Sequence, residues 1–135
     1  MAFEDSMNIA ASGMKVQGDR MRVISENLAN ADSLARTPGG DPYRRQVATF
    51  ENVMNEEMGV QQVQIDEIET DQSDFQKEYR PGHPAANEDG YVKTPNVKSL
   101  VETADMREAQ RSYQANLKVI ENSRSMMQEL VSLLR

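Results

Sequence analysis

The side chains that most often carry catalysis or bind metals are sparse in this chain. His83 is the single histidine among 135 residues, and there is no cysteine. A histidine that acts as a general base needs a partner group within hydrogen-bond reach, and the flanking Pro81 and Pro84 are typical of an irregular turn instead. Glu88 and Asp89 follow closely, so a calcium or zinc site formed with His83 is one alternative function, although surface carboxylates alone are common.

Two other stretches have some of the features of ligand-binding loops. An acidic run contains Asp66, Glu67, Glu69, Asp71 and Asp74. It lacks the central glycine and the ordered ligand spacing of a calcium loop, so it is typical of a solvated acidic face. Gly39-Gly40 is not followed by the Lys-Ser or Lys-Thr of a phosphate-binding loop. We therefore predict no catalytic residue, no metal, no cofactor and no small-molecule substrate, and the chain is not predicted to be an enzyme.

Composition points away from nucleic acids and toward protein partners. The net charge is −7, and residues 36–95 hold 6 basic against 12 acidic side chains. Binding to a phosphate backbone needs clustered Lys and Arg, so no nucleic-acid partner is predicted. Hydrophobic residues make up only 38% of the chain, and there is no tryptophan. Because a globule of this size buries most of its apolar surface, the shortage indicates an elongated shape or a fold completed by neighbours.

Residues 1–35 are predicted to form one long helix. Apolar residues recur at alternating spacings of three and four, with one polar interruption at Gln17, which is the pattern of a narrow helical stripe. The stripe consists of Met7, Ala10, Met14, Met21, Ile24, Leu28 and Ala31. Asp5 or Ser6 is placed to cap the start of this helix. Residues 37–40, Thr-Pro-Gly-Gly, cannot continue it.

Residues 96–135 are predicted to form a second long helix, because neither Gly nor Pro occurs from Val97 to Leu134. Ser99 and Glu102 have the spacing of a capping box at its start. Its apolar stripe contains Leu100, Met106, Tyr113, Leu117, Ile120, Met127, Leu130 and Leu134. We predict that twelve residues of these stripes form the seam through which the chain binds its partners: Met7, Met14, Met21, Ile24, Leu28, Met106, Tyr113, Leu117, Ile120, Met127, Leu130 and Leu134.

Residues 36–95 are predicted to form a small β-rich segment that separates the helices. Short strands are expected at residues 45–50, 60–65 and 91–94, where β-branched and aromatic residues gather. Asp89-Gly90 is expected to form a tight turn before the last strand. The chain thus divides into an N-terminal helix (1–35), a β-rich outer segment (36–95) and a C-terminal helix (96–135).

The predicted fold class is α+β, in which the terminal helices form an antiparallel, coiled-coil-like pair. Such a pair covers only one face of each helix. Small residues on other faces would admit further helices: Ala11, Gly13, Ala29, Ala109 and Ala115. Two interpretations follow, namely a subunit that assembles laterally and a self-sufficient helical hairpin. A cytoplasmic coiled-coil adaptor of fixed stoichiometry would be an example of the second.

Several segments resemble the bacterial flagellar axial proteins, the family of rod and hook subunits. Residues 25–31, Ser-Glu-Asn-Leu-Ala-Asn-Ala, are similar to the signature that closes the first helix in this family. Short amide side chains suit that place because they bond the free backbone groups of a helix end. The segment from Pro81 to Val97 and the part of the second helix around residues 111–116 resemble the proximal-rod members. The matching positions are Asn27, Leu28, Ala29, Asn30, Pro81, Gly82, His83, Pro84, Tyr113 and Asn116.

The resemblance implies a structural subunit of the proximal rod of the flagellar basal body, where terminal helices assemble into a torque-transmitting drive shaft. The implied partners are copies of itself, other rod subunits, the adaptor between rod and membrane ring, and the flagellar type III export apparatus. The implied location is the rod within the periplasm, reached without a cleavable signal peptide. In agreement, the first residues lack the basic and apolar regions of a secretory signal.

The length of the two helices has a consequence for the free subunit. Ordering the backbone costs about 1–2 kcal/mol per residue, and a single apolar seam cannot offset this cost over both ends of the chain. We therefore expect the terminal helices to be mobile in a free subunit and to become ordered when it joins an assembly.

Overall fold

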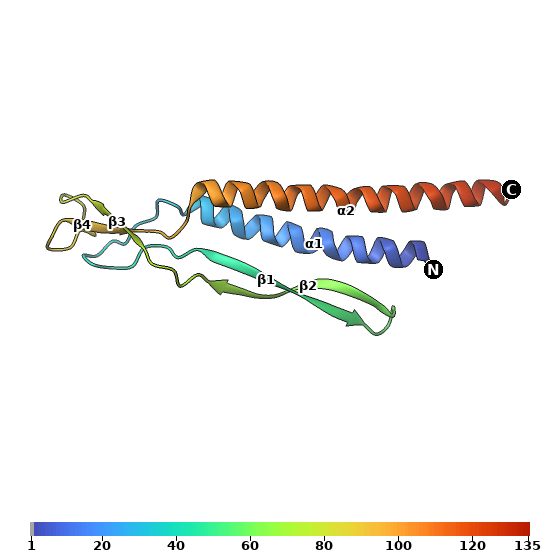
Figure 1. The fold of residues 1–135 in the computed structure, drawn as a ribbon, viewed down its shortest axis with the longest axis horizontal. Helices are drawn as coiled ribbons and strands as arrows, with labels where there is room; N and C mark the ends of the chain where they lie inside the picture. The colour runs from blue at the N-terminus through green and yellow to red at the C-terminus, as the bar shows by residue number, and fades with distance from the viewer. Residues whose placement is uncertain (1) are drawn as a thin grey trace. The chain divides into compact units, whose positions relative to one another are not determined.

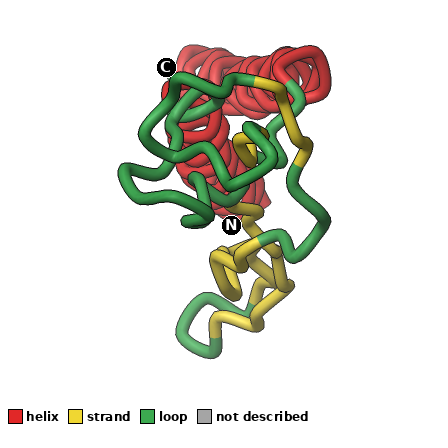
Figure 2. Tube along the Cα trace, turned by 90° about the vertical axis from the view of Figure 1, so that its left-hand side faces the viewer, coloured by secondary structure: helices red, strands yellow, loops and turns green. Residues whose placement is uncertain are grey.

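The computed structural model describes residues 2–135 and consists of two long helices joined by strands and loops (Figure 1). The elements, in chain order, are α1 (Ala2–Ala29), β1 (Gln46–Asn55), β2 (Val60–Thr70), β3 (Gln76–Tyr79), β4 (Tyr91–Thr94) and α2 (Ser99–Leu133). The strands, drawn in yellow in Figure 2, form two separate two-stranded sheets, β1 with β2 and β3 with β4. In the order of the sequence, all four strands come after α1 and before α2. The predicted α+β class is confirmed.

The chain divides into two compact units. The first unit holds residues 2–21 and 106–135, from the two helices, and residues 48–67, from the β1–β2 hairpin. The second unit holds residues 22–47 and 68–105, which include the end of α1, the β3–β4 sheet and the start of α2. Within residues 2–135, no helix combines the length and the apolar character that a bilayer crossing requires.

In the first unit, α1 packs against α2 on one side and against the hairpin on another. Arg20 pairs with Glu108 at 3.6 Å, whereas Gly13 faces Asn116, so the two helices run antiparallel as predicted. On its other side α1 meets β2, where the backbone N–H of Val63 donates to Ser12 Oγ at 3.3 Å. Figure 1 shows the first part of α1 between the hairpin and the second half of α2.

Small side chains are among the most buried residues of the two helices in the first unit. Ala10, Ala109 and Ser123 are buried there. A Cβ atom built on Gly13 would lie 2.6 Å from Asn116 Nδ2, so the side chain of Asn116 fills the space beside this glycine. The expectation that Ala109 lies on a face reserved for further helices is therefore wrong, because this residue is covered within its own unit.

Gly13 and Gly18 make a matched pair for testing this contact. Replacing Gly13 with Val should lower the stability of the subunit by about 1–3 kcal/mol, because the larger side chain must displace Asn116. Replacing Gly18 with Ala should raise stability by about 0.5–1 kcal/mol, since nothing lies within 4 Å of the added atom. Urea unfolding followed by circular dichroism measures both. Equal effects of the two substitutions would contradict close packing at Gly13.

The second unit is organised around the β3–β4 sheet and the end of α1. The two strands pair antiparallel, from Gln76 opposite Thr94 to Tyr79 opposite Tyr91. The rings of Tyr79 and Tyr91 meet edge to face, with their centroids 5.3 Å apart. The buried apolar side chains of the second unit are Val23, Ile24, Ala85 and Val92. The strand predicted at residues 91–94 is confirmed as β4.

The turn that precedes β4 needs a glycine for two reasons. Gly90 has a φ of 84°, which side chains rarely adopt, and a Cβ atom there would lie 2.9 Å from the ring of Tyr79. The side chain of Asn87 closes the turn, because its Oδ1 accepts from the backbone N–H groups of Asp89 and Tyr91 at 3.0 and 2.9 Å. The predicted turn at Asp89-Gly90 is therefore present.

Several predicted boundaries differ from the structure. The strands predicted at residues 45–50 and 60–65 extend to Asn55 and Thr70, and β3 was not predicted. The helix start expected at Asp5 or Ser6 is wrong: α1 already includes Ala2, and Ser6 Oγ donates to the carbonyl of that residue at 2.8 Å. At the other end, Asn30 Nδ2 donates to the carbonyl of Glu26 at 2.8 Å, as expected for an amide at a helix terminus.

Candidate assembly surface

The second half of α2 carries a run of exposed apolar side chains in the first unit. Its exposed members are Leu117, Val119, Met126, Met127, Leu130, Val131 and Leu133, and Leu134 follows directly after the helix. Leu130 is 48% exposed and Leu134 is 87% exposed. A soluble monomer rarely exposes so many large apolar residues together, and such patches mark binding surfaces. We call this set the α2 apolar surface.

The predicted seam residues fall into three groups. Ile24 is buried in the second unit. Seven others are partly covered: Met7, Met14, Met21, Leu28, Met106, Tyr113 and Ile120. The last four belong to the α2 apolar surface: Leu117, Met127, Leu130 and Leu134. The residues left open for a partner thus lie toward the end of α2, whereas those of α1 are at least partly covered.

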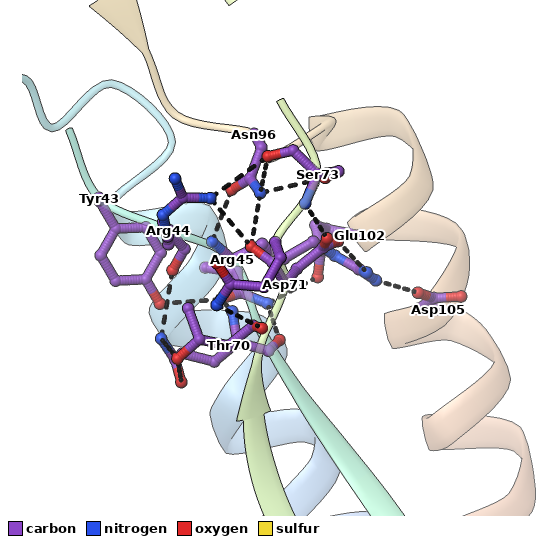
Figure 3. Close-up of polar contacts among 12 residues, drawn as sticks. Tyr43, Arg44, Arg45, Thr70, Asp71, Ser73, Asn96, Glu102 and Asp105 are labelled. Atoms are coloured by element: carbon purple, nitrogen blue, oxygen red, sulfur yellow. Dashed lines mark hydrogen bonds and ion pairs between the residues drawn. The ribbon is translucent and has the colours of Figure 1, made fainter. Parts of the chain in front are cut away.

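The most buried charged side chain of the described chain lies in the second unit, at the start of α2. Glu102 is completely inaccessible to solvent. Arg45 Nε donates to Glu102 Oε1, and the other two guanidinium nitrogens lie 3.4 Å from Asp71 Oδ2 and from Asp105 Oδ2 (Figure 3). Burial lowers the pKa of Arg45, but the hydrogen bond and charge of Glu102, and then of Asp71, outweigh it and raise the pKa overall. The guanidinium is therefore held as a cation against buried carboxylate.

Asn27 connects this ion pair to the end of α1 and to the residues that lead into β1. Its Nδ2 donates to Glu102 Oε2 at 3.2 Å and to the carbonyl of Gln46 at 2.8 Å. Its Oδ1 accepts from the backbone N–H of Gln46 at 2.9 Å and from the hydroxyl of Tyr43 at 2.8 Å. Burial raises the pKa of Tyr43, as do the negative charges of Glu26 and Glu102. All four hydrogen-bonding positions of the Asn27 amide are thus occupied.

Asn96 and Asp71 complete the cluster on the side of the loops. The backbone N–H of Arg45 donates to Asn96 Oδ1 at 2.8 Å, and Asn96 Nδ2 donates to the carbonyls of Asp71 and Ser73 at 3.0 and 3.1 Å. The hydrogen bonds from the backbone and side chain of Ser73, and then the Arg45 cation, lower the pKa of Asp71, against the opposing effect of burial. These residues tie the entry of β1, the exit of β2 and the start of α2 together.

We call Asn27, Tyr43, Arg45, Asp71, Asn96, Glu102 and Asp105 the polar cluster. From the sequence, Asn27 was singled out as part of the family signature, Asp71 as part of an acidic run and Glu102 as a helix cap, but no contact among these residues was predicted. Glu102 was predicted to form a capping box with Ser99, which is wrong because both of its carboxylate oxygens bind Arg45 and Asn27. The adjacent arginines Arg44 and Arg45 carry no signal that would separate them, although Arg44 lies over the ring of Phe75 at 4.1 Å and Arg45 enters the cluster.

The remaining residues of the family signature lie in turns and helix contacts. Pro81, Gly82 and Pro84 are exposed, and His83 Nδ1 accepts from the backbone N–H of Ala85 at 3.0 Å, which closes a local turn. Ala29 is the exposed last residue of α1. Within residues 2–135, no three His, Cys, Asp or Glu side chains gather so as to hold a metal ion.

Known proteins resemble this chain over nearly its whole length. It is 50% identical over 127 residues to the flagellar basal-body rod protein FlgC of Agrobacterium fabrum, an alignment that covers 94% of this chain and 91% of that protein. Identity to the FlgC proteins of Borreliella burgdorferi and Salmonella typhimurium is 37% and 36%, over 100% and 98% of this chain and over 99% and 98% of theirs. Residues 88–133 also match the family described as flagellar basal body rod FlgEFG protein C-terminal.

Two terminal helices with an uncovered apolar surface, together with these relatives, define a flagellar rod protein. Within that class, the chain belongs to the family of flagellar basal-body rod protein FlgC. It is therefore a structural component of the rod of the flagellar basal body, where it associates with other flagellar components. The predicted recognition of a flagellar axial protein is confirmed.

Proposed function

We propose that this chain is a subunit of the proximal rod that assembles through its terminal helices. The observation that supports this proposal is the α2 apolar surface, whose side chains are 38% to 87% exposed within the first unit. Burying an apolar surface is worth about 25 cal/mol per Å², so several large side chains supply a substantial drive for association. The assembled rod would transmit torque from the motor to the hook.

The proposal assigns a role to each segment of the chain. The helices, in residues 1–35 and 96–135, form the inner part of the assembly, and residues 36–95 lie outside and contact neighbours. The partners are copies of the same chain, other rod subunits and the adaptor between rod and membrane ring. The subunit would reach the periplasmic rod through the flagellar type III export apparatus, which also binds it.

Limited proteolysis tests whether assembly covers the helices. In the purified free subunit, we expect rapid cleavage within the second half of α2, because exposed and weakly packed segments open most easily. In basal bodies that contain the subunit, the same bonds should resist the protease. Mass spectrometry maps the cleaved bonds in both samples.

Equal resistance in the free and assembled states would contradict the proposal. That result would favour a self-sufficient helical hairpin, such as an adaptor of fixed stoichiometry. Cleavage between Pro81 and Pro84, in an exposed turn of the second unit, is followed in the same samples. Because the proposal places this segment outside the helical part of the assembly, its protection should change less than that of α2.

A further inference from the structure

A groove of about 700 Å³ lies between the start of α1 and the end of α2 in the first unit. Met7, Ile120, Met127 and Val131 give the groove an apolar lining, and Arg124 and Arg135 also line it. Both arginines are exposed, and neither forms an ion pair within residues 2–135. The groove therefore suits an occupant that combines flexible apolar side chains with adjacent carboxylates.

The turn of the β1–β2 hairpin, taken here with the last two residues of β1 as residues 54–59, has this combination. Met54 and Met58 are 52% and 48% exposed. Between them lie Glu56 and Glu57, which are exposed and form no ion pair within the described residues. Methionine side chains are unbranched and polarizable, so they fill irregular apolar grooves well.

The hairpin turn has a defined conformation. Asn55 Oδ1 accepts from the backbone N–H groups of Glu57 and Met58 at 3.1 and 3.2 Å, and the carbonyl of Asn55 accepts from the N–H of Gly59 at 2.7 Å. Gly59 has a φ of 67°, a conformation for which glycine is suited. Because the turn is already ordered, little entropy is lost when it binds.

The turn and the groove of one chain do not meet. No hairpin residue lines the groove. In the first unit α1 contacts the hairpin through Ser12 and contacts α2 through Gly13, and it lies between them in Figure 1. A turn that fills such a groove must come from another molecule. Because turn and groove are different surfaces, the contact is heterologous and continues from copy to copy, as a ring or helical assembly requires.

We propose that the hairpin turn of one copy inserts Met54 and Met58 into the groove of a neighbouring copy, with Glu56 and Glu57 facing Arg124 and Arg135. This inference rests on the proposed function, since it assumes that copies of the chain adjoin one another in the rod. Beyond that function, the inference specifies which two surfaces of neighbouring copies are in contact, the hairpin turn and the groove.

Disulfide trapping tests the contact directly, because the chain contains no native cysteine. The variant with Met58→Cys and Val131→Cys is expressed as the only copy of the subunit, and basal bodies are purified and oxidised. We expect subunits linked to one another on a non-reducing gel. The matched control combines Met58→Cys with Leu100→Cys, an exposed position at the opposite end of α2, and should give no linked product.

The outcomes separate the inference from the proposed function. If the double-cysteine subunit is present in basal bodies but remains unlinked, the inference is wrong and the proposed function stands. If the unmodified subunit is itself absent from basal bodies, the proposed function is wrong.

Charge reversal provides a second test that holds even if the cysteine variant does not incorporate. Arg124→Glu with Arg135→Glu should reduce incorporation by about tenfold or more, the size of effect expected for like charges across an interface. Adding Glu56→Arg and Glu57→Arg should restore it. Arg111→Glu, at an exposed position on α2 that does not line the groove, should have little effect. A defect that the hairpin changes do not correct would overturn the inference and indicate a different occupant.

Discussion

Replacing Arg45 with Met should destabilise the subunit by about 3–5 kcal/mol, one of the largest effects expected of any single change. The substitution leaves Glu102 charged and fully buried without its cation, and breaking one side of a buried ion pair typically costs this much. Asp71 and Asp105 also lose a partner, but both are partly exposed, so water can solvate them. Urea unfolding monitored by circular dichroism measures the loss.

Two further variants show whether the ion pair is the cause. Adding Glu102→Met to Arg45→Met removes the stranded charge, so most of the lost stability should return. Arg44→Met is the matched control, because the neighbouring arginine only stacks on Phe75 and bonds two carbonyls at 3.4 Å. Its cost should be about 1 kcal/mol or less. Equal losses for Arg44→Met and Arg45→Met would show that the polar cluster has no special role.

Replacing Leu130 and Leu134 together with Asp should abolish incorporation into the rod and therefore swimming. Each exposed leucine that becomes buried contributes about 1.5–3 kcal/mol to association, and a carboxylate in its place must be desolvated without a partner. The helix content of the free variant should equal that of the unmodified free subunit, because Leu130 is 48% and Leu134 is 87% exposed. Motility in soft agar and blotting of purified basal bodies measure the two effects.

The same change at Leu100 serves as the control for this prediction. Leu100 is 85% exposed, close to the value of Leu134, and lies in the first turn of the same helix. An acidic residue is favoured there by the helix dipole. A swimming strain with both leucines replaced by Asp, or an equal defect from Leu100→Asp, would argue against a specific role of the α2 apolar surface.

The helices could be predicted from the sequence because their apolar residues repeat over many turns. The apolar residues from Met7 to Leu28 recur at spacings of three and four, a pattern that fits a helix and does not fit a strand. The strand β3 could not be predicted, since Gln-Lys-Glu-Tyr has no apolar alternation and all four residues are exposed. It exists because its backbone pairs with β4, a contact that depends on residues more than ten positions away.

The buried residues of the second unit also could not be predicted from the spacing of apolar residues. Patterns of large apolar residues predict a core of Leu and Met, but Glu102 and Asn27 are among the most buried side chains. Their burial depends on Arg45, which is 57 residues away from Glu102 in the chain. A single sequence does not show which of two adjacent arginines forms such a pair. The family signature did include Asn27. Its side-chain amide lies near the end of α1, but it also exchanges hydrogen bonds with the backbone of Gln46 at the start of β1.

Labelling of a single cysteine at Leu130 is the most direct test of the claim that the end of α2 is an assembly surface. The Leu130→Cys subunit contains one thiol, because the native chain has none. A water-soluble maleimide should modify it readily in the free subunit and poorly in intact basal bodies. Equal modification in both states, with the variant incorporated and the cells swimming, would contradict the account, because the α2 apolar surface would then stay open to solvent in the rod.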